Sequence, residues 1–231
     1  MEKQTVNILL NVDSKFEPKA KYIFRIMLKI LGFNPVFYDQ ISSQDIHIYY
    51  GLRTTDEYPL KIYRSIETAL FFNQKNKLPD SKYNSVKYRY EYIPFLFSLK
   101  GEIFTISQKT VYLRKDLISS AFYFLSLWQD YIFHEKKSSH SKFNYKESLQ
   151  YKYNFPEIPV IDRYCDILKN ALQISSPDLI NNHSFSKNKK FILSLSHNID
   201  FWNFITKEEI RKINKRNLKQ LKKFSVSALY K

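Results

Sequence analysis

The run Thr5-Val-Asn-Ile-Leu-Leu10 and the segment Lys19-Ala-Lys-Tyr-Ile-Phe-Arg-Ile-Met-Leu-Lys-Ile-Leu31 set the architecture of this chain. The first is a short apolar run, which predicts a buried strand over 5–10. The second predicts a helix, because Gly32 stands where a helix ends and the apolar residues recur at helical spacing. That apolar stripe consists of Ile23, Ile26, Met27, Ile30 and Leu31.

Two further strands are predicted nearby, at Val36–Tyr38 and at Ile46–Tyr50, the latter ending on Gly51. His47 alternates with Ile46 and Ile48 and is expected on the opposite face of its strand. Strand, helix and strand within about 35 residues predict a βαβ unit. The expected fold class is therefore α/β, a mixed sheet with packed helices.

The middle of the chain is less clear. Leu60–Phe72 fits a strand pair or a helix equally well, whereas Tyr88–Phe97 and Ile103–Ser107 have the pattern of strands on either side of Gly101. These segments add strands to the predicted sheet without fixing their order.

A long helix is predicted after Asp116, which offers an N-cap to the run Leu117–Ile132. That run is apolar nearly all round, so the helix should be buried on most sides, and its Trp128 is expected in the core rather than as a platform for a sugar. The polar segment His134–Ser148 is predicted as a loop. Ile161–Leu172 is predicted as an amphipathic helix with Cys165 on its apolar stripe.

Three parts are expected along the chain: an α/β domain over 1–175, a linker over 176–190 and a smaller unit over 191–231. The linker is predicted because this stretch contains Ser, Pro, Asn and Lys and few apolar residues. The last unit has the pattern of a strand at Phe191–Leu195, a helix that begins at Thr206 and a strand at Phe224–Tyr230.

Composition excludes several kinds of site. With only three glycines, the chain contains no G-x-G-x-x-G or G-x-x-x-x-G-K-[ST] phosphate loop and no G-x-S-x-G nucleophile turn. Cys165 is the single cysteine, so neither an intrachain disulfide nor a zinc site with several cysteines is expected. The five histidines include no H-x-x-x-H pair.

The chain is expected to lie in the cytoplasm. Its first residues lack the layout of a signal peptide. The longest apolar stretch, Leu117–Phe133, contains Gln129 and Asp130 and is too short and polar to span a membrane. We therefore expect a soluble protein without a membrane span.

Basic charge gathers near the end of the sequence. The formal net charge is +15, and 12 basic and 3 acidic residues lie from Ser186 to Lys231, a net of +9 there. A helix over Lys207–Lys223 with this charge is one candidate for contact with nucleic acid or an acidic glycan. The same helix also carries an apolar stripe of Ile and Leu, which needs a partner surface. This favours the alternative in which the basic side of the helix is simply exposed to solvent.

A polar cluster, Ser196-His197-Asn198-Ile199-Asp200, directly follows the predicted strand Phe191–Leu195. The carboxyl end of a parallel strand is where α/β enzymes hold their ligands, although such residues are also common in ordinary loops. The segment Phe191-Ile-Leu-Ser-Leu-Ser-His-Asn-Ile-Asp200 resembles the first motif of the polysaccharide deacetylases, in its Thr-His-Asp-Val-Asp form. In that family the first Asp of the motif is the general base and the second is a zinc ligand.

The upstream sequence carries the resemblance further. Asp116–Tyr131 is similar to the Asp-x-x-x-Ser-Ala-Phe-x-x-Leu-Ser-Arg-x-Glu-Glu-Tyr stretch of the domain that precedes the deacetylase barrel. Lys142-Phe143, Glu147–Lys152 and Pro159–Leu168 follow in the order of that domain. The resemblance implies an accessory domain over 1–175 and, over 191–231, a strand-helix-strand remnant of a (β/α) barrel.

The departures from the family decide the functional expectation. Asn198 occupies the base position, and an amide does not accept a proton from water at neutral pH. Asp200 matches the metal-ligand position, with His197 as a weaker candidate, but the H-x-x-x-H motif is missing. The 41 residues after Lys190 (231 − 190) are also far fewer than the about 250 of a common barrel. In the accessory domain Leu127 replaces an Arg, and Gln129-Asp130 replaces Glu-Glu.

We therefore expect a deacetylase-like protein of N-acetylated glycan metabolism that is catalytically incomplete and binds no cofactor, zinc being implied by the resemblance alone. Trp202 could stack on a sugar in a whole enzyme or cover the strand ends here. The strands of the last unit would need the main domain or a partner chain to cover them.

Overall fold

The computed structural model describes residues 4–39, 45–52, 54, 57–75, 77, 83–107, 110–136, 143–181 and 215. The chain divides into two compact units, Met1–Phe185 and Ser186–Lys231. Of the second unit only Lys215 is described, in a helical conformation with an exposed side chain. The predicted strands Phe191–Leu195 and Phe224–Tyr230 and the barrel remnant they belong to lie outside the described residues.

The first unit is built on a mixed sheet of six strands in the order β2-β1-β3-β4-β8-β7. The first five in this order are parallel, and β7 runs antiparallel to β8 at the edge. The strands are β1 (Thr5–Leu10), β2 (Asn34–Tyr38), β3 (Ile48–Gly51), β4 (Leu60–Tyr63), β7 (Phe104–Ser107) and β8 (Thr110–Leu113). The parallel strands follow one of the common orders of open α/β sheets, and the predicted α/β class with a mixed sheet is confirmed.

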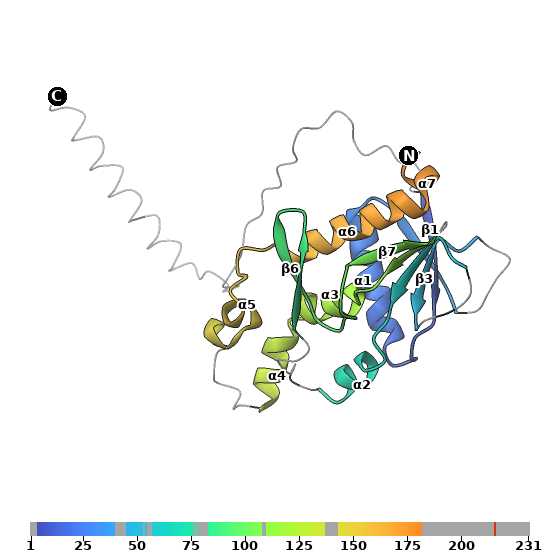
Figure 1. Cartoon of the computed structure of the whole chain (residues 1–231). Coiled ribbons are helices and arrows are strands. Elements are labelled where there is room, and N and C mark those ends of the chain that lie inside the picture. Colours follow the sequence, from blue (N-terminus) through green and yellow to red (C-terminus); the bar gives the residue numbers. More distant parts are fainter. Residues whose placement is uncertain are drawn as a thin grey trace, which may run out of the picture. The chain divides into compact units, whose positions relative to one another are not determined.

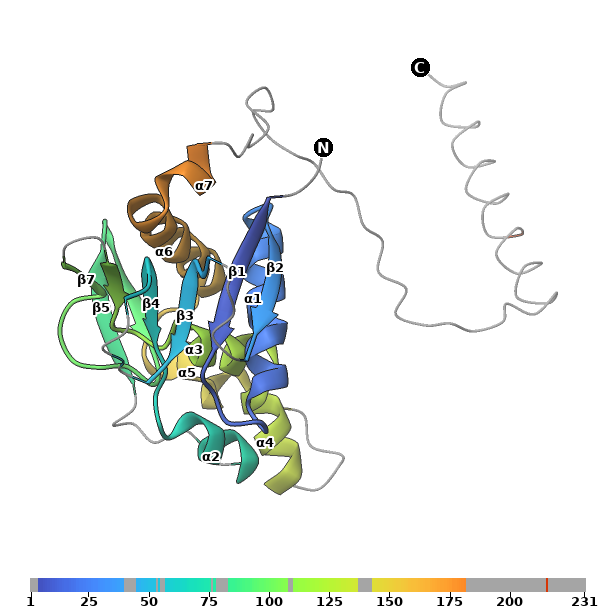
Figure 2. The same ribbon diagram turned by 90° about the vertical axis from the view of Figure 1, so that its right-hand side faces the viewer.

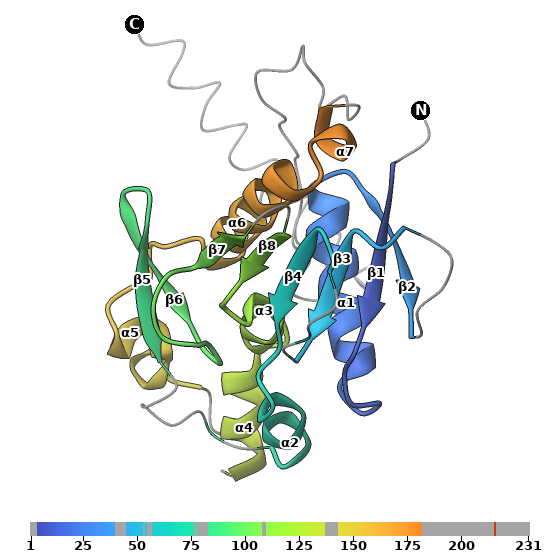
Figure 3. The same cartoon turned by 45° about the vertical axis from the view of Figure 1, so that its right-hand side comes forward.

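Three helices pack on one face of this sheet: α1 (Glu17–Ile30), α3 (Leu117–Leu125) and α6 (Val160–Ser175). Figure 3 shows the sheet in front of them. Ile8 and Ile48 of the sheet are fully buried together with Phe24, Ala121 and Leu168 of these helices. The predicted βαβ unit and amphipathic helices are therefore present, and their apolar stripes form the core.

The ends of α1 follow local sequence. Pro18 lies in its first turn and Gly32, at φ 83°, follows its last turn, as the sequence predicts. The helix begins at Glu17, two residues before the predicted start, because the backbone N–H of Glu17 already donates to the carbonyl of Asp13 at 2.9 Å.

Both ends of the sheet carry short helices (Figures 1 and 2). At the end where the parallel strands finish lie α2 (Thr68–Asn73) and α4 (Trp128–Lys136), and at the opposite end lies α7 (Pro177–Asn181). Trp128 of α4 packs on Phe72 of α2 with ring centroids 4.9 Å apart and is 7% exposed, so its predicted place in the core is confirmed.

A separate hairpin, β5 (Asn84–Tyr88) and β6 (Glu91–Phe95), lies beside α6. Arg163 of α6 forms two hydrogen bonds with the carboxylate of Glu91, at 2.5 and 3.0 Å. The buried Tyr164 hydroxyl donates to the carbonyl of Pro94 at 2.5 Å. The hairpin is thereby attached to the helix that covers the main sheet.

The prediction of one long helix over Leu117–Ile132 is wrong in one respect, because the structure has two helices there, α3 and α4. Leu127 has φ 52°, a left-handed conformation that interrupts the helix without a glycine or proline. The N-cap prediction is confirmed, since the Asp116 carboxylate accepts from the backbone N–H of Ser119 at 3.0 Å. The break turns Trp128 towards α2.

Three other segments differ from their predictions. Leu60–Phe72 is neither a strand pair nor one helix, but β4 followed by α2. Leu60 and Ile62 are buried in the strand, and Phe71 and Phe72 are buried in the helix. Strands occupy Asn84–Tyr88 and Glu91–Phe95 instead of one run over Tyr88–Phe97. The loop predicted over His134–Ser148 begins with the end of α4 and contains a 3-10 helix, η2 (Tyr145–Glu147), before α5 (Leu149–Lys152).

The helix α7 falls within the segment predicted as a linker. It forms there because Leu179 and Ile180 supply apolar side chains that are buried in the core. The rest of that segment, residues 182–190, lies outside the described residues.

Candidate functional site

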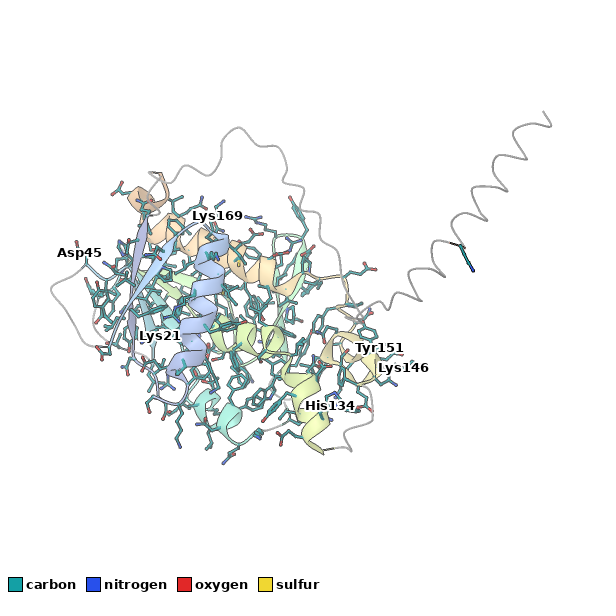
Figure 4. All side chains as sticks on the ribbon, turned by 180° about the vertical axis from the view of Figure 1, so that it is seen from behind. Lys21, Asp45, His134, Lys146, Tyr151 and Lys169 are labelled. Atoms are coloured by element: carbon teal, nitrogen blue, oxygen red, sulfur yellow. The ribbon has the colours of Figure 1, made fainter. Side chains whose placement is uncertain are left out.

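A cavity of about 320 Å³ opens where the chain turns from α3 into α4 and where η2 and α5 pack against that turn. Most of its lining residues come from three segments that resemble the deacetylase accessory domain, whereas Tyr145 and Pro156 lie outside those segments. The lining residues are Phe124, Leu127, Gln129, Asp130, Phe143, Tyr145, Ser148, Gln150 and Pro156, and this set is called the α4–α5 pocket below. Figure 4 labels Lys146 and Tyr151, on η2 and α5, and His134 on α4.

Gln129 holds the two sides of the pocket together. Its Oε1 accepts from the backbone N–H of Leu149 at 2.6 Å, and its Nε2 donates to Oε1 of Gln150 at 2.9 Å. The Ser148 hydroxyl caps α5 by accepting from the backbone N–H of Tyr151 at 3.2 Å. The side chain of Gln129 therefore fixes the start of α5 against α4.

The shape of the pocket depends on the left-handed residue Leu127, whose side chain is 66% exposed at the rim. A left-handed conformation is unusual for a residue with a branched side chain and costs of the order of 1 kcal/mol. Such strain is frequently kept where it positions functional groups. Here it turns α4 so that Gln129 and Asp130 come to line the cavity.

The pocket combines aromatic surface with polar groups. Tyr145 is half exposed and meets Tyr151 edge-on at 5.7 Å, while Phe143 packs on Phe133 at 5.4 Å. Asp130 makes no hydrogen bond or ion pair with another described residue. An exposed aromatic ring, together with a carboxylate and amide groups, can pack on and hydrogen-bond a polar ligand.

Asp116, the first residue of the resembling stretch, is fully buried and has four donors on its carboxylate. Oδ1 accepts from the Tyr50 hydroxyl at 2.9 Å and from the N–H of Ser119 at 3.0 Å. Oδ2 accepts from the N–H of Ser65 at 2.7 Å and from the Ser119 hydroxyl at 2.8 Å. These four residues are called the Asp116 network below.

The ionisation state and the burial of Asp116 both indicate that the Asp116 network stabilises the fold. Burial raises the pKa of Asp116 to about 6, while the four hydrogen bonds act in the opposite direction. The carboxyl group is thus ionised at pH 7, and all its acceptor positions are in use. It ties the link after β4 to the link after β8, and it is not accessible for catalysis.

Cys165 is buried in the core and burial raises the pKa of its thiol to about 12, so it is present as the unreactive thiol, as predicted. His47 directly precedes β3, and its Nδ1 accepts from the backbone N–H of Asn7 in β1 at 3.0 Å. An acceptor Nδ1 requires the neutral ring with its proton on Nε2. Burial correspondingly lowers the pKa of His47.

The residues predicted from the deacetylase motif, His197, Asn198, Asp200 and Trp202, lie outside the described residues. The same holds for the basic helix Lys207–Lys223 apart from Lys215. Within the described ranges, no group of three His, Cys, Asp or Glu side chains is placed to hold a metal ion.

Comparison with known proteins places this unit in a family. Residues 8–177, which are 170 of the 231, match a family described as a family of unknown function (DUF7033). The chain belongs to this family. The DUF7033 region contains the α4–α5 pocket and the Asp116 network, whereas Asn198 and Asp200 follow it. No curated protein and no solved structure matches the chain.

None of the helices in the described part of this DUF7033 protein is long and apolar enough to cross a membrane. The longest, α6, has 16 residues and a polar side.

Sequence reasoning found the segments of the α4–α5 pocket but not the pocket. Asp130 and Gln150 belong to separate similar stretches, 20 positions apart, and nothing in either stretch shows that they line one cavity. The break at Leu127 has no Gly or Pro to signal it. The buried Arg64, considered below, was missed because a single arginine after an apolar run has no distinctive pattern.

Proposed function

We propose that the DUF7033 domain of this chain is a non-catalytic glycan-binding domain of N-acetylated polysaccharide metabolism, and that the α4–α5 pocket is its binding site. The observation that carries the proposal is that Asp116–Tyr131, Phe143 and Glu147–Lys152, which lie in deacetylase-like segments, all contribute lining residues to one cavity, together with Tyr145 and Pro156. A concave site lined by aromatic side chains and a few polar groups is the usual form of a ligand-binding site.

The chemistry of the pocket supports a sugar rather than an ion. The Tyr145 ring presents an apolar face and a hydroxyl, which suits the C–H face and the hydroxyl edge of a pyranose. The Gln150 amide nitrogen has no partner among the described residues and is a donor suited to an acetamide carbonyl. The carboxylate of Asp130 makes no hydrogen bond with another described residue and is an acceptor suited to sugar hydroxyl groups.

The proposal assigns no turnover to this chain. Asn198 stands where the resembling family has its general base, and an amide does not accept the proton of the attacking water. Asp200, His197 and zinc therefore enter only through the resemblance. The buried single cysteine is consistent with a reducing compartment, and we propose the cytoplasm as the location.

Binding of N-acetylchitooligosaccharides to the full chain, measured by isothermal titration calorimetry, tests the proposal. We expect Tyr145→Ala to weaken binding at least about tenfold, which corresponds to about 1.4 kcal/mol. Tyr90→Ala is the matched control, since Tyr90 is 98% exposed on the β5–β6 turn and does not line the pocket. An unchanged affinity in Tyr145→Ala would contradict the assignment of the site.

A separate assay tests the absence of catalysis. Acetate release from the same oligosaccharides is measured with added zinc, and no release above a protein-free control is expected. Zinc-dependent release by the purified chain would overturn the non-catalytic part of the proposal and leave the binding part intact.

The alternative, contact with nucleic acid or an acidic glycan through Lys207–Lys223, stays a prediction. A gel shift at low salt tests it, since such binding should weaken steeply as salt is added.

A further inference from the structure

Three basic residues follow the carboxyl ends of two neighbouring parallel strands. Arg64 comes directly after β4, and Arg114 and Lys115 come directly after β8. The two strands pair in register with Ile62 opposite Leu113, so Arg64 and Lys115 each follow their paired residue by two positions. In open α/β sheets, ligands are bound outside the carboxyl ends of the strands.

Arg64 is 7% exposed, so its guanidinium group is largely removed from water. Its Nε is buried without a hydrogen-bond partner, and the guanidinium group makes no ion pair with any residue that the structure describes. The backbone holds the residue in place, since the N–H of Arg64 donates to the carbonyl of Gly51 at 2.8 Å. An unpaired buried charge costs several kcal/mol.

The neighbouring groups do not remove this excess of positive charge. Lys115 is fully buried with its Nζ on the carbonyl of Leu99 at 2.5 Å, and Nε of Arg114 is also buried without a partner. Burial, together with the charge of Arg114, lowers the pKa of Lys115. Asp116 is the adjacent carboxylate, but its oxygens already accept four hydrogen bonds, none of them from Arg64.

We propose that Arg64 is the anchor of an oxyanion-binding site at the carboxyl ends of β4 and β8, which takes a carboxylate or phosphate group. The planar guanidinium group matches both ligands, because each presents two oxygens to paired N–H donors. A bound oxyanion supplies an acceptor for the buried Nε–H of Arg64 and an ion-pair partner that none of the described residues provides. This inference is independent of the α4–α5 pocket, which Arg64 does not line.

Thermal unfolding of the full chain tests the site, with inorganic phosphate and glucuronate as probes and sodium chloride at equal ionic strength as reference. At least one probe should raise the melting temperature by about 2 °C or more at saturating concentration. A response to phosphate alone identifies a phosphate ligand, and a response to glucuronate alone identifies a carboxylate. If neither probe exceeds the chloride reference, the proposal is wrong.

Two variants assign the response to Arg64. Arg64→Met should abolish the rise without lowering the melting temperature in probe-free buffer, because it removes an unpaired buried charge. Arg64→Lys keeps the charge and loses the paired donors, so the affinity for the probe should fall at least about tenfold.

Arg25→Met is the matched control. Arg25 is exposed on α1, over the Phe37 ring at 5.4 Å, and its replacement should leave the response unchanged. A full response in Arg64→Met, checked for native circular dichroism, would overturn the assignment. If Arg64→Met does not fold, the affinity of Arg64→Lys decides: an unchanged affinity excludes the site.

Discussion

The Asp116 network and the α4–α5 pocket lie at the two ends of the same helix, α3, and they differ in whether their polar groups have hydrogen-bond partners. In the network, a fully buried carboxylate has a donor for every position. In the pocket, the carboxylate of Asp130 and the amide nitrogen of Gln150 have no partner among the described residues. The first arrangement is expected to stabilise the fold, while the second leaves groups free for a ligand.

The difference also extends to the backbone. The network begins α3 with an N-cap of the usual kind, whereas the pocket ends it at a strained left-handed leucine. The network thus follows the local rules that stabilise a helix, whereas the pocket breaks one of them at Leu127. Such departures are common at ligand-binding sites.

The largest expected effect is that of Asp116→Asn. The amide nitrogen would face N–H donors that now reach a carboxylate oxygen, so the free energy of unfolding should fall by about 2 to 4 kcal/mol. Urea unfolding at pH 7 measures this. Asp178→Asn is the control, since Asp178 is exposed on α7 and should change stability by less than about 0.5 kcal/mol. A loss no larger than that of the control would remove the distinction between the two regions.

A smaller effect of opposite sign is expected at the pocket. Leu127→Gly should raise the free energy of unfolding by about 0.5 to 1 kcal/mol, because glycine adopts φ 52° without strain. Leu127→Ala keeps a Cβ in the same left-handed conformation and should give no gain. Urea unfolding of the two variants side by side checks this, and equal stabilities would show that the break is not strained.

The smallest effect concerns His47, which accepts a backbone N–H as Asp116 does but is only half buried. Burial lowers its pKa in the folded state, so the unfolded chain binds the proton more readily. Stability should therefore be lost as the pH falls below the unfolded value of 6.5, by a few tenths of a kcal/mol after solvent screening.

His47→Gln isolates this contribution. The difference in unfolding free energy between the natural chain and this variant is measured from pH 7.5 to 5, and it should shrink as the pH falls. A constant difference would mean that the Asn7–His47 bond does not depend on the protonation of the ring.

Much of the fold was predictable because it depends on local pattern. The strand Thr5–Leu10, the left-handed Gly32 and the N-cap Asp116 all follow from residues within one or two turns of chain. The burial of Cys165 followed from its place on the apolar stripe of α6. The periodicity of apolar residues reports which side of an element is buried, whatever it packs against.

The sequence by itself thus determined the α/β class, the helices α1 and α6 that cover the sheet, and the N-cap at Asp116. The break at Leu127 was decided by tertiary packing, because Trp128 gains aromatic contacts with Phe72, over 50 positions away, that outweigh a continuous helix.

Tertiary structure also decided the α4–α5 pocket, the partners of Asp116 and the isolation of Arg64. Each depends on which side chains from distant segments meet, or fail to meet. Local sequence determines which side of an element is buried. Which donors and acceptors become hydrogen-bond partners there depends on how segments distant in sequence pack together.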